Sequence, residues 1–545
     1  AIPATRVADC TFNTDAIIKQ VYEAIDKDVD IICFPELCIT GYSCQDLFLT
    51  EKLLTEADNN MQRLLNQFAD KEITIIVGMP YRSGTGLYNC AFVLQKGRIQ
   101  GKQAKHYLPN YNEFYERRWF CSADCHTQPN DVINNIFEIS DADSGVAGKV
   151  RFGIELCEDV WSPNPPSTLK AIDGADIIFN LSASNELIGK HQYLCNLLSQ
   201  QSARTISAYV YSSCGFGEST QDLVFGGNAL IYENGELLAR SNRFSTNPQM
   251  VVADIDVELI RNERLQNSTF REVNNKENHN LSCPINLKIN FLDKRNFYRN
   301  INPHPFVPAD EHDLRQRCEE ITNIQSLALA KRIMHVNAKK VVIGVSGGLD
   351  STLSLLVACQ AMDKIGRNRA DIVGITMPCF GTTSRTHDNA LKLMKWLGIT
   401  SKEINIADAV NQHFTDIGHN PAVHNLTFEN CQARERTQVL MDYACKDGGF
   451  VLGTGDLSEL ALGWCTYNAD HMSMYNVNAS IPKTLVRYLV NYYASITTTD
   501  EHQVLIDILE TPVSPELLPP TADGKIAQKT EDTVGPYELD RKSVV

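Results

Sequence analysis

The sequence predicts an α/β protein of two domains, and three observations lead to this prediction. The chain has 545 residues, which at about 150 residues per domain suits two to four domains. Each half alternates β-rich runs with helical patterns, as layered α/β domains do. A polar stretch separates the halves, so we predict a first domain at residues 1–257, a linker at 258–312 and a second domain at 313–545.

In the first half, short apolar runs bounded by turn residues predict strands, and apolar residues spaced at the helical period predict helices. The predicted strands are Asp30–Phe34, Ile73–Met79, Asn89–Gln95, Val150–Leu156, Asp176–Leu181, Ala208–Ser213 and Asn228–Tyr232. The predicted helices are Thr14–Lys27, Leu54–Phe68 and His191–Ile206. An Asn234-Gly235 turn follows the last strand, which adds a hairpin to the domain.

From about Glu258 to His312 the sequence is polar and predicts an irregular connection. A long helix over Glu311–His335 then leads through an apolar strand at Lys339–Val345 into a glycine turn. Strands at Ile372–Thr376 and Phe450–Thr454, with helices between them, continue the pattern. Strands that alternate with helices predict a parallel sheet, which binds ligands at the carboxyl ends of its strands.

Composition excludes several classes of protein. Fifty Lys and Arg against 66 Asp and Glu give a net charge of −16, which disfavours a general nucleic-acid binder or a binder of anionic membranes. The longest apolar runs fall well short of the ~20 residues that a spanning helix needs. The 17 cysteines are scattered through apolar segments, a usage that predicts reduced thiols in a cytoplasmic protein.

Three residues at the ends of first-domain elements form a chemically consistent set: Glu36, Lys105 and Cys157. Taken singly, each is more often structural than catalytic. A thiol that attacks an amide, however, needs a base to take its proton and a cation to stabilise the oxyanion. Glu36 can be that base, Lys105 the cation and Cys157 the nucleophile.

The flanks of these residues, Phe34-Pro-Glu36, Leu108-Pro-Asn-Tyr111 and Cys157-Glu-Asp, resemble those of nitrilase-superfamily amidases. The resemblance to the glutaminase members spans about residues 15–255, and it implies an α-β-β-α sandwich. The first strand of that fold is poorly formed around Ile2–Cys10. The positions that the resemblance assigns to glutamine binding are Tyr111, Glu158, Trp161, Ser184 and Lys190.

The second half contains Ser346-Gly347-Gly348-Leu349-Asp350-Ser351 between an apolar strand and a helix. Successive backbone N–H groups of such a turn can bind phosphate oxygens, and the two serines can add hydroxyl donors. The segment lacks the Gly-Lys-Ser/Thr of NTPases that transfer a γ-phosphate. It resembles the PP-loop of ATP pyrophosphatases, which belongs to a Rossmann-like parallel-sheet domain, and Asp350 offers a hard oxygen ligand for Mg²⁺.

Further motifs follow the loop in order, among them Gly453-Thr454-Gly455-Asp456 and Asn478-Ala-Ser-Ile-Pro-Lys483. The series is similar to NAD synthetases over residues 313–538, and this resemblance implies the remaining roles. The implied ATP contacts are Ser346, Gly347, Gly348, Asp350, Ser351, Met377, Thr454, Lys483 and Ser514. The implied Mg²⁺ ligands are Asp350 and Glu459, and the implied contacts to deamido-NAD⁺ are Arg434, Asp470 and Lys529.

Together the two resemblances imply a carbon–nitrogen ligase that uses glutamine as its nitrogen donor. Glutamine would be hydrolysed through a Cys157 thioester, and the ammonia would amidate ATP-adenylated deamido-NAD⁺ to give NAD⁺, AMP, pyrophosphate and glutamate. Relatives are homo-oligomers, and we expect the same here. Two alternatives stay open: an amidotransferase that amidates a different acceptor, and a catalytically silent protein that senses glutamine or ATP.

Overall fold

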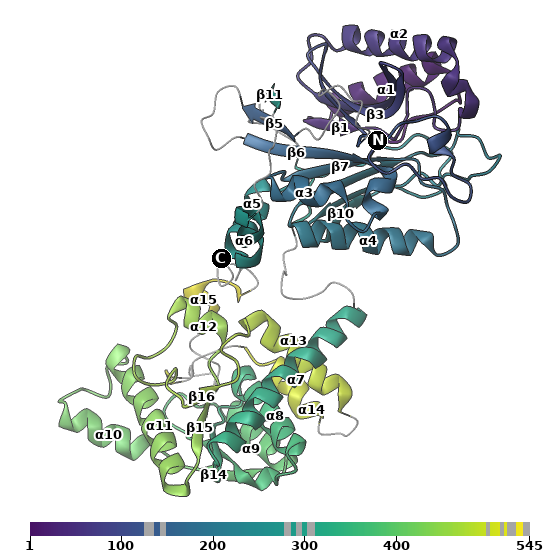
Figure 1. Ribbon diagram of the computed structural model, residues 1–545. Helices are drawn as coiled ribbons and strands as arrows, with labels where there is room; N and C mark the ends of the chain where they lie inside the picture. Colours follow the sequence, from purple (N-terminus) through teal and green to yellow (C-terminus); the bar gives the residue numbers. More distant parts are fainter. Residues whose placement is uncertain are drawn as a thin grey trace. The chain divides into compact units, whose positions relative to one another are not determined.

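The computed structural model describes residues 1–124, 136–141, 149–276, 285–289, 297–301, 311–497, 502–512, 517–519 and 530–537. The chain forms two compact units, Ala1–Asn300 and Ile301–Val545 (Figure 1). The predicted end of the first domain at residue 257 and the predicted start of the second domain at residue 313 stay predictions. No helix of the described residues is long and apolar enough to cross a bilayer.

The first unit contains two β-sheets. The smaller has the order β1-β2-β3-β4, in which β1 pairs parallel with β2 and the other pairs are antiparallel. Its strands are β1 (Ile31–Cys33), β2 (Thr74–Ser83), β3 (Gly86–Gln95) and β4 (Arg98–Ala104). The larger sheet has the order β10-β9-β8-β7-β6-β5-β11, with a parallel centre of β6, β7 and β8. Its strands are β5 (Ile136–Asp141), β6 (Lys149–Leu156), β7 (Ile177–Ser182), β8 (Ala208–Ser213), β9 (Ala229–Glu233), β10 (Glu236–Arg240) and β11 (Ile285–Ile289).

Side-chain alternation along the strands builds four layers. On β2, Ile75 and Val77 pack in the core shared with helices α1 (Cys10–Ile25) and α2 (Glu51–Gln67), whereas Ile76 packs between the two sheets. Phe152 and Phe179 of the larger sheet meet Ile76 in that inner core. Helices α3 (Pro166–Ile172) and α4 (Lys190–Thr205) lie on the outer face of the larger sheet. Because successive residues of a strand point to opposite faces, the first unit is the expected α-β-β-α sandwich (Figure 1).

Every strand and helix predicted in the first half is present, with ends that differ by a few residues. The Asn234-Gly235 turn joins β9 to β10 with both residues at positive φ. The segment Ile2–Cys10 contains no strand before α1 begins at Cys10, and Ile2 makes only an isolated bridge to Gln249.

The prediction of an irregular connection from about Glu258 to His312 was wrong in two places: strand β11 within it extends the larger sheet, and two helices lie at its start. Helix α5 (Val257–Gln266) begins there, followed by α6 (Ser268–Lys276). Asp256 caps α5 by accepting the N–H of Leu259 at 2.9 Å. Only Ile260 and Arg264, one turn apart, are buried on α5. Because one of these two residues is charged, the buried face of the helix leaves no apolar period in the sequence.

The second unit is built on a parallel sheet of order β14-β13-β12-β15-β16. Its strands are β12 (Val341–Gly344), β13 (Ile372–Thr376), β14 (Thr400–Glu403), β15 (Phe450–Gly453) and β16 (Tyr475–Asn476). Its helices are α7 (Glu311–His335), α8 (Leu349–Lys364), α9 (Ser384–Trp396), α10 (Ala407–Asp416), α11 (Leu426–Asp447), α12 (Leu457–Leu462), α13 (Lys483–Ile496), α14 (His502–Leu509) and α15 (Glu531–Val534).

Helices cover both faces of this sheet. On the central strand β12, Val341 and Ile343 pack with α7, α8 and α13, and Val342 packs with α10 and α11. The strand is therefore apolar on both faces, as its sequence predicted. Its carboxyl end leads into the glycine turn before α8, and the neighbouring β15 ends just before Thr454.

Candidate active sites

The first candidate site forms where three strands end. Glu36 follows β1, Lys105 directly follows β4, and Cys157 directly follows β6. The ammonium of Lys105 lies 2.7 Å from Glu36 Oε1, and neither side chain is exposed to solvent. Glu36 Oε1 also accepts a hydrogen bond from Asn89 Nδ2 at 2.6 Å. Two of the three predicted residues thus form a buried ion pair.

Cys157 lies within the electrostatic reach of this pair. Burial raises the pKa of the Cys157 thiol, and the negative charge of Glu36 raises it further, while Lys105 lowers it. The thiol is therefore protonated at neutral pH. Since the thiolate is the nucleophile, Cys157 needs a base during attack, and Glu36 is a carboxylate close enough to perturb it.

The backbone at Cys157 is in an unusual conformation. Its φ is +39°, a region that non-glycine residues adopt at a cost of order 1 kcal/mol or more. Its N–H donates to Asn180 Oδ1 on β7 at 3.1 Å, and Asn180 Nδ2 in turn donates to Tyr209 Oη at 3.0 Å. The sharp turn at Cys157 is therefore held by a hydrogen bond to a side chain of the neighbouring strand β7.

A second glutamate, Glu116, belongs to the same buried cluster. Its Oε1 lies 2.6 Å from Lys105 Nζ and accepts the hydroxyl of Tyr42 at 2.8 Å. Burial raises the pKa of Glu116 to about 7, a rise that Lys105 opposes and Glu36 reinforces. Glu116 is not apparent as a site residue from the sequence, because a glutamate in a polar and aromatic run carries no sign that the fold will bury it.

Four of the five predicted glutamine contacts lie in two touching pairs. Tyr111 Oη donates to Glu158 Oε1 at 2.9 Å, and the ammonium of Lys190 lies 5.3 Å from the centre of the Trp161 ring. Burial lowers the pKa of Lys190. The fifth residue, Ser184, is buried and is anchored through its backbone N–H. Glu158 and Lys190 carry the opposite charges needed to bind the α-ammonium and the α-carboxylate of an amino acid. The role of the five residues in glutamine binding stays a prediction.

The second candidate site begins at the turn between β12 and α8. Gly347 has a φ of +85°, and a Cβ there would collide with the carbonyl oxygen of Thr386, so the position requires glycine. Ser346 Oγ accepts the N–H of Gly348 at 3.3 Å and lies 3.2 Å from Ser351 Oγ. The two serine hydroxyls and the start of α8 thus face the same space, as a phosphate-binding loop requires.

Beside this loop, three carboxylates surround one lysine. Asp350 Oδ2, Asp456 Oδ2 and Glu459 Oε1 lie 2.6, 2.6 and 2.9 Å from Lys483 Nζ. Burial lowers the pKa of Lys483, but the three carboxylates outweigh it and hold that pKa well above its usual range. Burial, together with the charge of Asp350, raises the pKa values of Asp456 and Glu459.

The carboxylate cluster fits a divalent cation. One ligand atom from each of Asp350, Asp456 and Glu459 lies within 4.8 Å of the others, and Asp350 Oδ1 is buried without a hydrogen-bond partner. Carboxylate oxygens are the ligands that Mg²⁺ prefers. Asp350 and Glu459 were predicted as ligands from the sequence, whereas Asp456 was not, although it stands in the Gly453-Thr454-Gly455-Asp456 motif.

The other predicted ATP contacts lie at strand ends. Thr454 follows β15, and its carbonyl accepts from Asn478 Nδ2 at 3.2 Å. The same amide donates to the carbonyl of Asp350 at 3.1 Å, so Thr454 adjoins the phosphate-binding loop. Met377 follows β13 and is buried. Ser514 lies outside the described residues.

Two of the three predicted dinucleotide contacts meet at one loop, which contains Asp470 and which Arg434 reaches from helix α11. Arg434 Nε donates to the carbonyl of Tyr467 at 3.2 Å, and Asp470 Oδ1 accepts the N–H of Thr466 at 2.8 Å. Both side chains are accessible to solvent. Lys529 lies outside the described residues.

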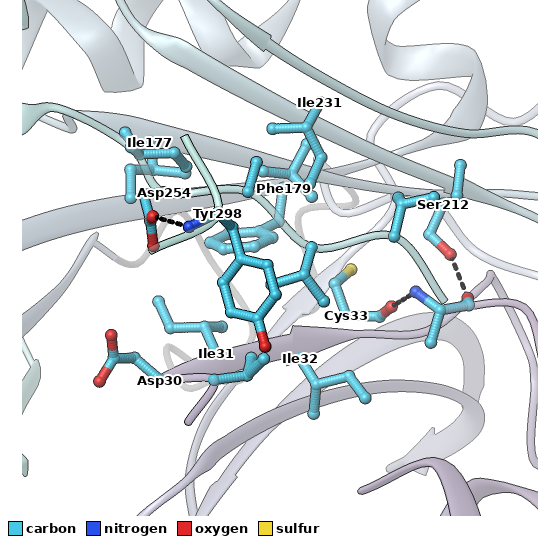
Figure 2. Close-up of a pocket in the computed structure, with 18 of the residues that line it drawn as sticks. Asp30, Ile31, Ile32, Cys33, Ile177, Phe179, Ser212, Ile231, Asp254 and Tyr298 are labelled. Carbon is cyan, nitrogen blue, oxygen red and sulfur yellow. Dashed lines mark hydrogen bonds between the residues drawn. The ribbon is translucent and has the colours of Figure 1, made fainter. Parts of the chain in front are cut away.

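A separate cavity of about 250 Å³ lies in the first unit. Figure 2 shows Ile177, Phe179 and Ile231 on one side of it and the β1 residues Ile31 and Ile32 on the other. None of the predicted reactive residues lines this mainly apolar cavity. Chemistry is therefore assigned to the two polar clusters.

Comparison with known proteins gives matches in both units. Residues 4–264 match the family model for carbon-nitrogen hydrolases, and residues 321–541 match that for NAD synthases. The glutamine-dependent NAD(+) synthetase of Mycobacterium bovis is 40% identical over 557 aligned positions, which cover 98% of this chain and 80% of that protein. That of Mycobacterium leprae is 39% identical, with the same coverage. A solved structure of the Acinetobacter baumannii enzyme in complex with ADP is 25% identical, covers 94% of this chain and 84% of its own, and gives a TM-score of 0.41.

Proposed function

The chain belongs to the glutamine-dependent NAD(+) synthetases, and from that premise we propose how its residues divide the reaction. It is a ligase that takes its amide nitrogen from glutamine, with a carbon-nitrogen hydrolase domain and an NAD synthase domain in one chain. We propose domains at 1–257 and 313–545, with 258–312 between them. We assign glutaminase chemistry to the first and adenylation chemistry to the second.

In the glutaminase half, Glu36 takes the proton of Cys157 as the sulfur attacks the carboxamide carbon of glutamine. The ammonium of Lys105 stabilises the oxyanion that forms, and Glu36 and Glu116 hold that ammonium from two sides at 2.7 and 2.6 Å. Glu36 then passes the proton to the departing nitrogen, so that ammonia leaves and a γ-glutamyl thioester remains. Water, deprotonated by Glu36, hydrolyses the thioester to glutamate.

The substrate is oriented in this scheme by the five predicted contacts. Glu158 binds the α-ammonium of glutamine, and Lys190 binds its α-carboxylate. Tyr111, Trp161 and Ser184 complete the pocket. The ion pair of Glu36 and Lys105 beside the buried Cys157 is the single observation that carries this half of the proposal.

In the synthetase half, ATP phosphates lie against the loop Ser346–Ser351, whose N–H groups and hydroxyls donate to them. Lys483 neutralises charge on the departing pyrophosphate, while Thr454, Met377 and Ser514 contact the nucleotide. The nicotinate carboxylate of deamido-NAD⁺ attacks the α-phosphorus, and ammonia then displaces AMP. Arg434, Asp470 and Lys529 hold the dinucleotide.

We propose that Asp350 and Glu459 hold Mg²⁺, with Asp456 beside them. The cation neutralises phosphate charge when it is bound. Lys483 already lies among these carboxylates, so the cluster can balance a cation and an anionic substrate side by side. All cysteines of the described residues carry free thiols, which supports a cytoplasmic location. A homo-oligomeric state is part of the same proposal.

The test follows the nitrogen atom. The protein is incubated with amide-¹⁵N glutamine, ATP, Mg²⁺ and deamido-NAD⁺, and the products are analysed by mass spectrometry. We expect ¹⁵N in the amide of NAD⁺ and one AMP for each NAD⁺ formed. Label that appears only as free ammonia, or an acceptor other than deamido-NAD⁺ that alone releases pyrophosphate, would refute the assignment.

A further inference from the structure

The carboxylate of Asp159 connects the two segments that carry the nucleophile and the lysine of the first site. Asp159 lies in the 3₁₀ helix Cys157–Trp161 and is completely buried. Its Oδ2 accepts the backbone N–H of Leu156, the residue before Cys157, at 3.0 Å. Its Oδ1 accepts the N–H groups of His106 and Tyr107, which follow Lys105, at 3.2 and 2.8 Å.

This arrangement satisfies three backbone donors, two of which belong to the buried residues Leu156 and His106. Strand β4 ends at Ala104, so His106 and Tyr107 lie beyond its ladder of hydrogen bonds. A buried N–H without an acceptor costs about 1–3 kcal/mol, and hydrogen bonds to a carboxylate are stronger than those to neutral acceptors. One carboxylate therefore fixes the ends of β4 and β6 to each other.

We propose that Asp159 is a positioning residue for the glutaminase reaction. It holds the turn at Cys157 against the segment that carries Lys105, and this role rests on the functions proposed above for those two residues. Asp159 and its three N–H donors form a clamp between the two segments. Because the φ of +39° at Cys157 is unfavourable for a cysteine, we expect the turn to change conformation when the hydrogen bonds on one side of this clamp are lost. A displacement of about 1 Å between reacting groups can cost roughly 10²-fold in rate.

Asp159→Asn is the informative variant. An amide of the same shape has one acceptor and one donor, so it can accept from Leu156 or from His106 and Tyr107 but not from both sides. We expect kcat for glutamine hydrolysis to fall about 10- to 100-fold. We expect KM for glutamine to change less than about threefold, since the ground-state contacts remain. Ammonia-dependent NAD⁺ synthesis should keep its wild-type rate.

Asp176→Asn is the matched control. Asp176 is also almost fully buried, and its carboxylate accepts the N–H of Arg151 at 3.0 Å and bonds Arg261. Its loss should lower the thermal midpoint while kcat for glutamine stays at the wild-type value. Wild-type kcat in Asp159→Asn, or an equal loss of kcat in Asp176→Asn, would overturn the positioning role.

Hydrogen exchange on the wild-type protein tests the clamp even if Asp159→Asn fails to fold. The amides of Leu156, His106 and Tyr107 should be protected and should open together; exchange of any of them at the rate of an exposed amide would overturn the proposal. Cys157→Ala distinguishes a failure of the proposed nucleophile from a failure of the proposed role of Asp159. Glutamine-dependent activity in Cys157→Ala would refute the nucleophile itself, whereas an inactive Cys157→Ala with a fully active Asp159→Asn would refute only the role of Asp159.

Discussion

Replacement of Lys105 by methionine should affect both the rate and the pH dependence of stability. Methionine keeps most of the length of the side chain and removes the charge that lies 2.7 Å from Glu36 and 2.6 Å from Glu116. Loss of one partner from a buried ion pair typically costs about 3–5 kcal/mol. Loss of an oxyanion stabiliser costs about 10²–10³ in rate, so acylation by glutamine should slow by that factor.

The sign of the pH effect follows from Glu116. With Lys105 present, burial already raises the pKa of Glu116 to about 7, and Lys105 opposes that rise; the variant will raise the pKa further. A carboxyl group whose folded pKa lies above its unfolded value of about 4.3 binds protons on folding. The variant therefore loses stability as the pH rises from about 4 through the folded pKa.

Thermal unfolding at pH 5.5 and pH 8 measures this effect, and stopped-flow acylation measures the rate. Lys102→Met is the matched control, because Lys102 lies on the same β4 strand but places its ammonium over the Tyr81 ring. We expect the stability deficit of Lys105→Met to be larger at pH 8. A deficit that is equal at both pH values, or acylation at the wild-type rate, would refute the reasoning.

Three further predictions concern the other proposed groups. Glu36→Gln should bind glutamine but form the thioester at least about 10²-fold more slowly, because an amide cannot take the thiol proton; rapid-quench detection of the thioester measures this, and wild-type acylation would exclude Glu36 as the base. Cys157→Ala should lose glutamine-driven NAD⁺ synthesis and keep synthesis from ammonium salts at slightly alkaline pH, with a stability change of at most about 1 kcal/mol; a folded variant inactive with ammonia would contradict two independent sites. Asp350→Ala and Glu459→Ala should each reduce Mg²⁺-dependent pyrophosphate release with either nitrogen donor, and near-normal release would remove that residue from the metal site.

The elements that the sequence predicts well are those whose pattern is local. The strands before Glu36 and Ser346 are continuous apolar runs, and the predicted strand Val150–Leu156 before Cys157 is apolar except at Arg151 and Glu155. Both the strands and the residues that follow them were therefore predicted. Strand β4 was missed because its first two residues, Arg98 and Ile99, are exposed at the sheet edge and most of its other residues are polar. Helix α5 was missed because only Ile260 and Arg264 anchor it.

The residues missed at the two sites are those whose role depends on long-range burial. Glu116 enters the first site because Tyr42, 74 residues away in sequence, and Lys105, 11 residues away, converge on its carboxylate. Asp456 caps α12 by accepting the N–H of Glu459 at 2.9 Å, a local role that conceals its second contact with Lys483. A local pattern does not reveal which carboxylates will share a cation.

The left-handed backbone at Cys157 places stability and activity in opposition at one residue. Glycine would adopt its φ of +39° without the cost of order 1 kcal/mol or more that cysteine bears there. Evolution toward a more stable fold would therefore favour glycine at this position, at the expense of the nucleophile. A library selected only for thermostability should accumulate glycine at residue 157, whereas one selected for growth on glutamine as the nitrogen source should retain cysteine and acquire its stabilising changes elsewhere.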